Sequence, residues 1–171
     1  MPVFVDTSSA VDINKLTEYV SLLKSSNSLS VLTGARNIRR LLSGSNPPIQ
    51  KILDQRILPD LLNHLQHDNN GELRCECSWI ITNIASGPSS CSTTLVNSGA
   101  LEALIYSLSS PDPKLSEQCI WAIGNIAGDS ITNRNIVLKT NAPDMIIRNG
   151  VVILIYFSIL SLILIFLQDF C

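Results

Sequence analysis

An eleven-residue segment that recurs at a fixed distance is the feature that most constrains the fold of this chain. CSWIITNIASG, from Cys77 to Gly87, returns as CIWAIGNIAGD, from Cys119 to Asp129. The matching Cys, Trp, Ile, Asn and Ala positions all keep the separation of Cys77 from Cys119, and a weaker copy, NIRRLLSG from Asn37, precedes WIITNIAS by the same interval. This constant interval, the repeat period, indicates a stack of similar helical units, each of which buries its apolar face against the next.

The apolar residues inside each unit have the spacing of an α-helix. Positions i, i+3, i+4 and i+7, which share one helix face, are apolar in two sets. The sets are Leu58, Leu61, Leu62, Leu65 and Leu101, Leu104, Ile105, Leu108. Turn-forming residues separate the helices, and no long stretch alternates apolar with polar residues. We therefore predict an all-α fold over residues 12–148, with about two complete repeats and one partial repeat, after a disordered segment at 1–11.

Composition and motifs narrow the function. A net charge of -2 gives no reason to expect nucleic-acid binding. No phosphate-binding glycine loop, HExxH or GxSxG motif occurs, so we do not expect an enzyme. His64, His67, Cys75 and Cys77 match no common zinc spacing, and neither a metal nor a cofactor is expected. The odd number of cysteines, five, favours a reducing cytosolic or nuclear compartment.

The repeated segment carries a Trp and an Asn four residues apart, as Trp79 with Asn83 and Trp121 with Asn125. Residues at this spacing lie on one helix face, so stacked units would form a ladder with one indole and one amide per rung. An Asn side chain can hydrogen bond the main chain of an extended peptide, and an indole attracts the cation of Lys or Arg. Asp129, one turn after Asn125, would select such a cation. Alternatively, both Trp residues are core residues between stacked helices.

These residues also carry a family resemblance. WIITNIASG and SEQCIWAIGNIAGD resemble the second and third armadillo repeats of importin-α, the adaptor family that binds basic nuclear localisation signals. NPPIQKILDQRILPDLL resembles the end of the first repeat, and the similarity runs from about residue 12 to about residue 147. The resemblance implies a right-handed superhelical armadillo-repeat solenoid that binds Lys/Arg-rich cargo peptides for import, in the cytoplasm and nucleus. The peptide-binding residues that it implies are Trp79, Asn83, Ser86, Gly87, Ser92, Gln118, Trp121, Asn125 and Asp129.

The chain also departs from the family's pattern. The family carries a basic amino-terminal arm that binds importin-β, and none precedes residue 12, so importin-β is a doubtful partner. Asn37 and Leu41 stand at the Trp and Asn positions of the first unit, so we expect no functional rung there. The third Trp/Asn rung and all later repeats are missing.

The segment 149–171 is expected to form an apolar C-terminal helix. VVILIYFSILSLILIFL, residues 151–167, has no charge and reaches the lower limit of a transmembrane helix, about 17 residues. Three interpretations stay open: a truncated or intron-retaining gene product, a membrane tail anchor, and a buried helix of the next unit. The alternative functions are accordingly a membrane-anchored helical-repeat tether for a protein partner, or a non-functional truncated adaptor.

Overall fold

The computed structural model describes residues 12–148, and all regular structure in that range is helical. The prediction of an all-α fold is confirmed. A 3₁₀ turn (Ile13–Lys15) precedes the α-helices, whose bounds are α1 Leu16–Leu23, α2 Ser28–Leu42, α3 Ile49–Leu53, α4 Leu58–His67, α5 Gly71–Ala85, α6 Ser89–Asn97, α7 Ala100–Ser107, α8 Pro113–Asp129, α9 Ile131–Leu138 and α10 Ala142–Arg148.

The helices keep the period seen in the sequence. Helices α1, α4, α7 and α10 begin at residues 16, 58, 100 and 142. Helices α6 and α9 begin at residues 89 and 131, and α5 and α8 begin at residues 71 and 113. Equivalent helices are therefore one repeat period apart, and each helical unit repeats the one before it.

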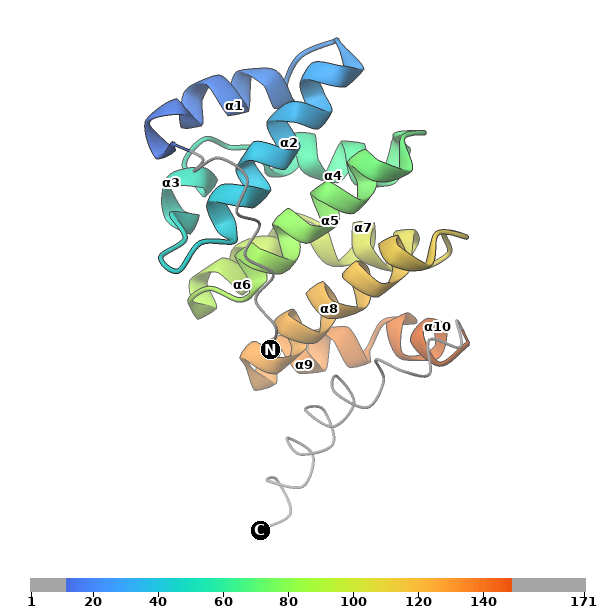
Figure 1. Cartoon of the computed structure of the whole chain (residues 1–171). Coiled ribbons are helices and arrows are strands. Elements are labelled where there is room, and N and C mark those ends of the chain that lie inside the picture. Colours follow the sequence, from blue (N-terminus) through green and yellow to red (C-terminus); the bar gives the residue numbers. More distant parts are fainter. Residues whose placement is uncertain (1–11, 149–171) are drawn as a thin grey trace.

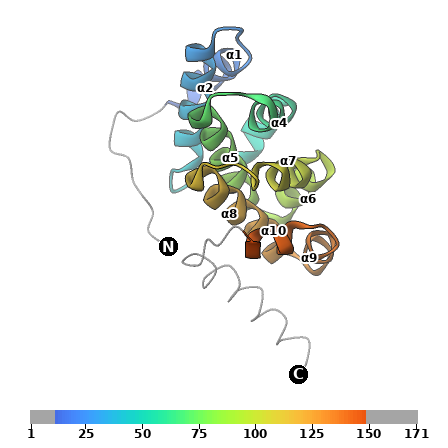
Figure 2. The same ribbon diagram turned by 90° about the vertical axis from the view of Figure 1, so that its right-hand side faces the viewer.

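The helices form two layers. The three longest helices, α2, α5 and α8, lie side by side in one layer, and the shorter helices cover it from behind (Figures 1 and 2). The apolar sets predicted from the sequence lie in α4 and α7 or just beyond, and all eight side chains are buried. Isoleucines of α5 and α8, among them Ile80, Ile84 and Ile126, are buried in the same core.

Side-chain caps set where the three long helices begin. The Asn27 side-chain oxygen accepts from the Ser30 N–H at 3.0 Å at the start of α2. Asn70 accepts from the N–H groups of Glu72 and Leu73 at the start of α5. Asp112 accepts from the Lys114 N–H at 3.0 Å at the start of α8. Each cap satisfies backbone N–H groups that the helix itself leaves unpaired, and the starts of the three long helices follow the repeat period to within one residue.

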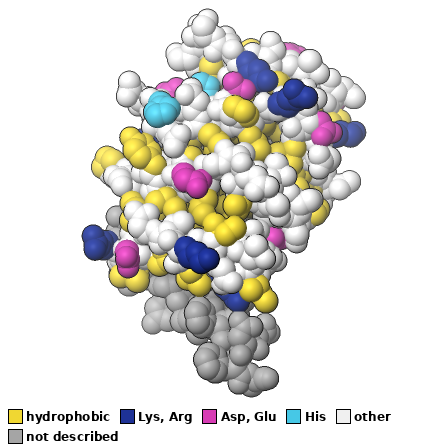
Figure 3. All heavy atoms as spheres, turned by 180° about the vertical axis from the view of Figure 1, so that it is seen from behind, with side chains coloured by type: hydrophobic (Ala, Val, Ile, Leu, Met, Phe, Trp, Pro, Cys, Tyr) yellow, Lys and Arg dark blue, Asp and Glu magenta, His cyan; other side chains and the backbone are white. Residues whose placement is uncertain are grey.

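The face opposite the α2–α5–α8 layer carries mixed charge. Lys and Arg side chains lie interspersed with Asp and Glu on this face, with hydrophobic side chains between them (Figure 3). Within the described residues, this face therefore presents no patch of one sign to a charged partner.

The structure does not test the predictions made for the two ends of the chain. The segments 1–11 and 149–171, including the apolar stretch 151–167, lie outside the described residues. Among the helices of residues 12–148, none is both long enough and apolar enough to cross a membrane.

Candidate functional site

The α2–α5–α8 layer carries both Trp/Asn pairs, Trp79 and Asn83 on α5 and Trp121 and Asn125 on α8. All four side chains are half-buried, so part of each indole and each amide faces solvent. The alternative that both Trp residues are core residues between stacked helices stays open, because most of each residue is buried. Because α5 and α8 pack along their lengths and begin one repeat period apart, the two pairs occupy equivalent places on neighbouring helices.

Each Asn amide is held by the preceding helix. Asn83 Nδ2 donates to the Ser43 hydroxyl just after α2, at 3.5 Å. Asn125 Nδ2 donates to the Thr82 carbonyl of α5, at 3.2 Å. The Thr82 hydroxyl lies within hydrogen-bond distance of two carbonyls, that of Ser78 in its own helix at 2.9 Å and that of Gln118 in α8 at 3.2 Å. Within residues 12–148 the side-chain oxygen of each Asn has no recorded partner, so it stays open to a donor from a ligand.

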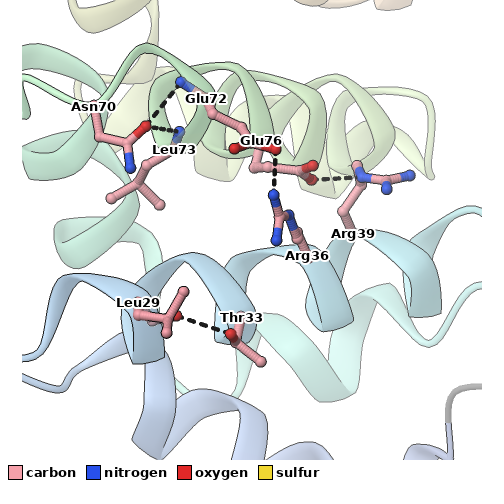
Figure 4. Close-up of polar contacts among 8 residues, drawn as sticks. All are labelled: Leu29, Thr33, Arg36, Arg39, Asn70, Glu72, Leu73 and Glu76. Atoms are coloured by element: carbon pink, nitrogen blue, oxygen red, sulfur yellow. Dashed lines mark hydrogen bonds and ion pairs between the residues drawn. The ribbon is translucent and has the colours of Figure 1, made fainter.

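The Trp79 ring is already in contact with a cation. The Arg39 guanidinium of α2 lies over the indole, 4.6 Å from its centroid. Arg39 Nε also donates to Glu76 Oε2 of α5 at 2.5 Å, and the two side chains are only 13% and 12% exposed. Figure 4 shows Arg39 reaching from α2 to Glu76, next to a second ion pair between Arg36 and Glu72.

Sequence reasoning did not find Arg39 or Glu76 as site residues. Arg39 belongs to a short basic cluster with Arg36 and Arg40, which is too small to indicate a nucleic-acid site. The available signal was the period, because Glu76 precedes Trp79 by three residues as Gln118 precedes Trp121. The contact itself depends on how α2 lies against α5.

Gln118 and Asp129, the polar residues predicted beside the Trp121–Asn125 rung, are both half-buried on α8. Gln118 Oε1 is buried and has no hydrogen-bond partner among the described residues. A buried acceptor without a donor is unusual, so a donor supplied by a ligand would stabilise it. Asp129 is the last residue of α8, and its Oδ2 accepts from Asn133 Nδ2 of α9 at 3.1 Å.

The three small residues predicted for the site gather where α5 ends and α6 begins. The Ser86 hydroxyl is exposed and donates to the Asn83 carbonyl at 2.8 Å. A Cβ on Gly87 would lie 2.6 Å from Ile49 Cδ1, so glycine permits the close packing there. Ser92 is fully buried and donates to the Ala85 carbonyl at 3.3 Å, so any part that it plays is support for the end of α5.

The first unit has no Trp/Asn rung in the structure either. Asn37 is half-buried on α2, and Leu41 is buried. An apolar buried side chain at the Asn position offers no hydrogen bond to a peptide.

Cysteine chemistry contributes no reactive group to this layer. Burial, and next the charge of Asp112, raises the pKa of the Cys75 thiol to about 11. Burial also raises the pKa of Cys77, and it raises that of Cys119 to about 12. A raised pKa lowers the fraction of thiolate at neutral pH, and the thiolate is the form that acts as a nucleophile or a metal ligand. Residues 12–148 hold no group of three His, Cys, Asp or Glu side chains that could bind a metal ion.

Comparisons with known proteins bear on the fold and the family of the chain. Residues 88–128, which contain α6, α7 and α8, match the family model described as Armadillo/beta-catenin-like repeat. The chain is 37% identical over 126 residues to importin subunit alpha-1b of Oryza sativa subsp. japonica, covering 73% of this chain and 24% of that protein. It is 36% identical over 137 residues to the probable importin subunit alpha-A of Dictyostelium discoideum, covering 79% of this chain and 25% of that protein.

The chain belongs to the importin-α family. It spans about a quarter of the length of the importin-α relatives it matches. The solved structures agree on the fold: a designed armadillo repeat protein in complex with the peptide (KR)4 superposes with a TM-score of 0.73 at 27% identity, covering 79% of this chain and 56% of that one. The importin-α resemblance and the armadillo fold expected from the sequence are thus confirmed.

Proposed function

We propose that the α5–α8 face binds an extended, Lys/Arg-rich peptide, and that the protein acts in this way as an adaptor for nuclear import, in the cytoplasm and nucleus. The observation that carries the proposal is the repeated Trp/Asn pair on two helices packed in the same register. Two supports come from similar proteins: the relatives are named importin subunits alpha, and a designed armadillo repeat protein of the same fold holds the peptide (KR)4.

The spacing of the rungs suits an extended chain. Packed helices lie about 8–10 Å apart, and an extended peptide rises about 3.3 Å per residue, so one rung corresponds to two or three peptide residues. The open oxygens of Asn83 and Asn125 can accept hydrogen bonds from main-chain N–H groups of the peptide. Such bonds do not depend on the side chains of the peptide. Trp79 and Trp121 then supply selectivity, because an indole face packs the methylene stem of Lys or Arg and attracts its charge.

Acidic and amide oxygens around the α8 rung extend this selectivity. Asp129 lies one turn beyond Asn125 and offers a carboxylate to a cation. Gln118 offers the buried oxygen that has no donor within the described residues. A Lys or Arg side chain supplies several N–H donors and no acceptor, which matches both groups.

The test is the binding of a fluorescent Lys-rich peptide, followed by anisotropy. Trp121→Ala should weaken binding about 2- to 30-fold, the range expected for one cation–π contact of about 0.5–2 kcal/mol. Asp129→Ala should weaken it about 10- to 150-fold, since a hydrogen bond to a charged group contributes about 1.5–3 kcal/mol.

Matched controls come from α7, in the other layer. Tyr106→Ala removes an aromatic side chain that is 59% exposed, and Glu102→Ala removes an exposed carboxylate. Neither should change peptide affinity. Equal affinities of Trp121→Ala, Asp129→Ala and the unmodified protein would show that the peptide does not bind on the α5–α8 face.

A further inference from the structure

Arg39 occupies the place at Trp79 that a peptide cation would otherwise take. Its guanidinium covers one face of the indole, 4.6 Å from the centroid, and its Nε is held by Glu76 at 2.5 Å. Since Arg39 is 13% exposed and Glu76 is 12% exposed, solvent screens this pair little. The Trp79 rung therefore has a bound cation before any peptide arrives.

Among residues 12–148, no cation is seen over the indole of the next rung, Trp121. One repeat period after Arg39 stands Ile81, which is fully buried, and one period after Glu76 stands Gln118. At the equivalent positions of the next unit, the charged pair is thus replaced by an apolar side chain and an amide. The amide oxygen of Gln118 has no donor in residues 12–148, whereas the Glu76 carboxylate is already paired.

We infer that Arg39 is an internal occupant of the Trp79 rung, which closes the α2 side of that rung and so limits how far a basic peptide can extend along the layer. The inference rests on the proposed binding of basic peptides. The Trp79 face toward α2, with Glu76, is chemically a site for Lys or Arg, and the chain fills it with its own Arg. The interval between the Trp79 and Trp121 rungs is the first part of the layer that is open to a ligand.

The energetics favour the internal cation over an external one. A peptide Lys that displaced Arg39 would replace one cation–π contact by another of similar strength. It would also have to separate Arg39 from Glu76 at a site where both groups are largely out of water, which leaves a charge without its partner. The internal Arg has lost its translational freedom by belonging to the same chain, whereas a peptide residue must lose it on binding.

The experiment compares three peptides on the full chain. A Lys-rich peptide that fits the Trp79–Trp121 interval serves as the short probe. Two longer probes carry about three further lysines at the N-terminus or the C-terminus, which is the length that spans one helix spacing. The quantity measured is the ratio of affinities, longer over short, in each protein variant.

In the unmodified protein the ratio should stay near one for both longer peptides. Arg39→Ala should raise it about 2- to 30-fold for the longer peptide that reaches toward α2, because the freed Trp79 face and the freed Glu76 carboxylate accept the added lysine. Arg36→Ala is the matched control: it removes the same charge from the same helix and also frees a glutamate, Glu72, but Arg36 does not cover an indole. Its ratio should stay near one.

Three results would overturn the inference. An equal ratio in the unmodified protein and in Arg39→Ala means that Arg39 closes nothing, and an equal rise in Arg36→Ala means that any lost positive charge suffices. Absence of binding by the short peptide itself refutes the proposed function, and with it this inference. If Arg39→Ala does not fold, Arg39→Gln places an amide N–H where the Arg Nε stands, so it keeps a hydrogen-bond donor for Glu76 but lacks the cation over the indole. A rise for the same longer peptide is expected of it.

Discussion

Gly34 on α2 is the position where adding one carbon should do the most damage to the packing of the helices. A Cβ at this residue would lie 2.5 Å from the backbone nitrogen of Leu23 and 2.6 Å from the carbonyl oxygen of Tyr19, both in α1. These neighbours belong to a backbone and not to a flexible side chain, so α1 and α2 must move apart to accept an alanine. The two helices pack along each other, and the burial of Leu23 and Val20 depends on that closeness.

The expected effect of Gly34→Ala is the difference of two terms. Alanine is about 0.8–1 kcal/mol better than glycine inside a helix. Overpacking a tight contact costs about 1–3 kcal/mol, and here two backbone atoms lie well inside contact distance. With two backbone atoms involved, the overpacking cost lies in the upper part of its range, about 2–3 kcal/mol, which leaves a net loss of about 1–2 kcal/mol in the free energy of unfolding.

Urea unfolding followed by far-ultraviolet circular dichroism measures this loss as a lower midpoint. Gly128→Ala is the matched control, because Gly128 lies in α8 and a Cβ there would meet nothing within 4 Å. The control should be neutral or stabilised by up to about 1 kcal/mol. If Gly34→Ala unfolds at the same urea concentration as Gly128→Ala, then α1 and α2 do not approach each other as closely as the structure shows.

Three further predictions concern a helix cap, an ion pair and a thiol. Asn70→Ala should lower the free energy of unfolding by about 1 kcal/mol, since the side chain caps two N–H groups of α5; an unchanged urea midpoint would contradict this. Glu76→Ala should destabilise more than Glu72→Ala, because the Glu76 pair with Arg is 12–13% exposed and the Glu72 pair is 37–55% exposed; equal melting temperatures would refute the ranking. Cys75, with its pKa raised to about 11, should react with iodoacetamide more slowly in the folded than in the urea-unfolded protein at mildly alkaline pH, and the native rate should rise with pH towards 11; equal rates in mass spectrometry would show that its environment does not disfavour the thiolate.

The repeat made much of the fold predictable. The repeat period and the i, i+3, i+4, i+7 apolar sets depend on spacing along the chain, and the helices of the structure begin at that period. The same reasoning brought Trp79 with Asn83 and Trp121 with Asn125 onto matching helix faces. It could not tell an exposed hydroxyl from a buried one, and the structure places Ser86 at the surface and Ser92 inside.

The sequence by itself determined the helices, their period and the repetition of one indole and one amide per unit, because these follow from local spacing within a single helix. Only the tertiary structure decided which groups meet between helices. Arg39 on Trp79, Asn83 on Ser43 and Asn125 on Thr82 join residues that are far apart in the sequence, and each contact depends on the register of two packed helices. No local rule specifies that register, since it results from how buried side chains such as Ile38 and Ile80 fit together in the shared core.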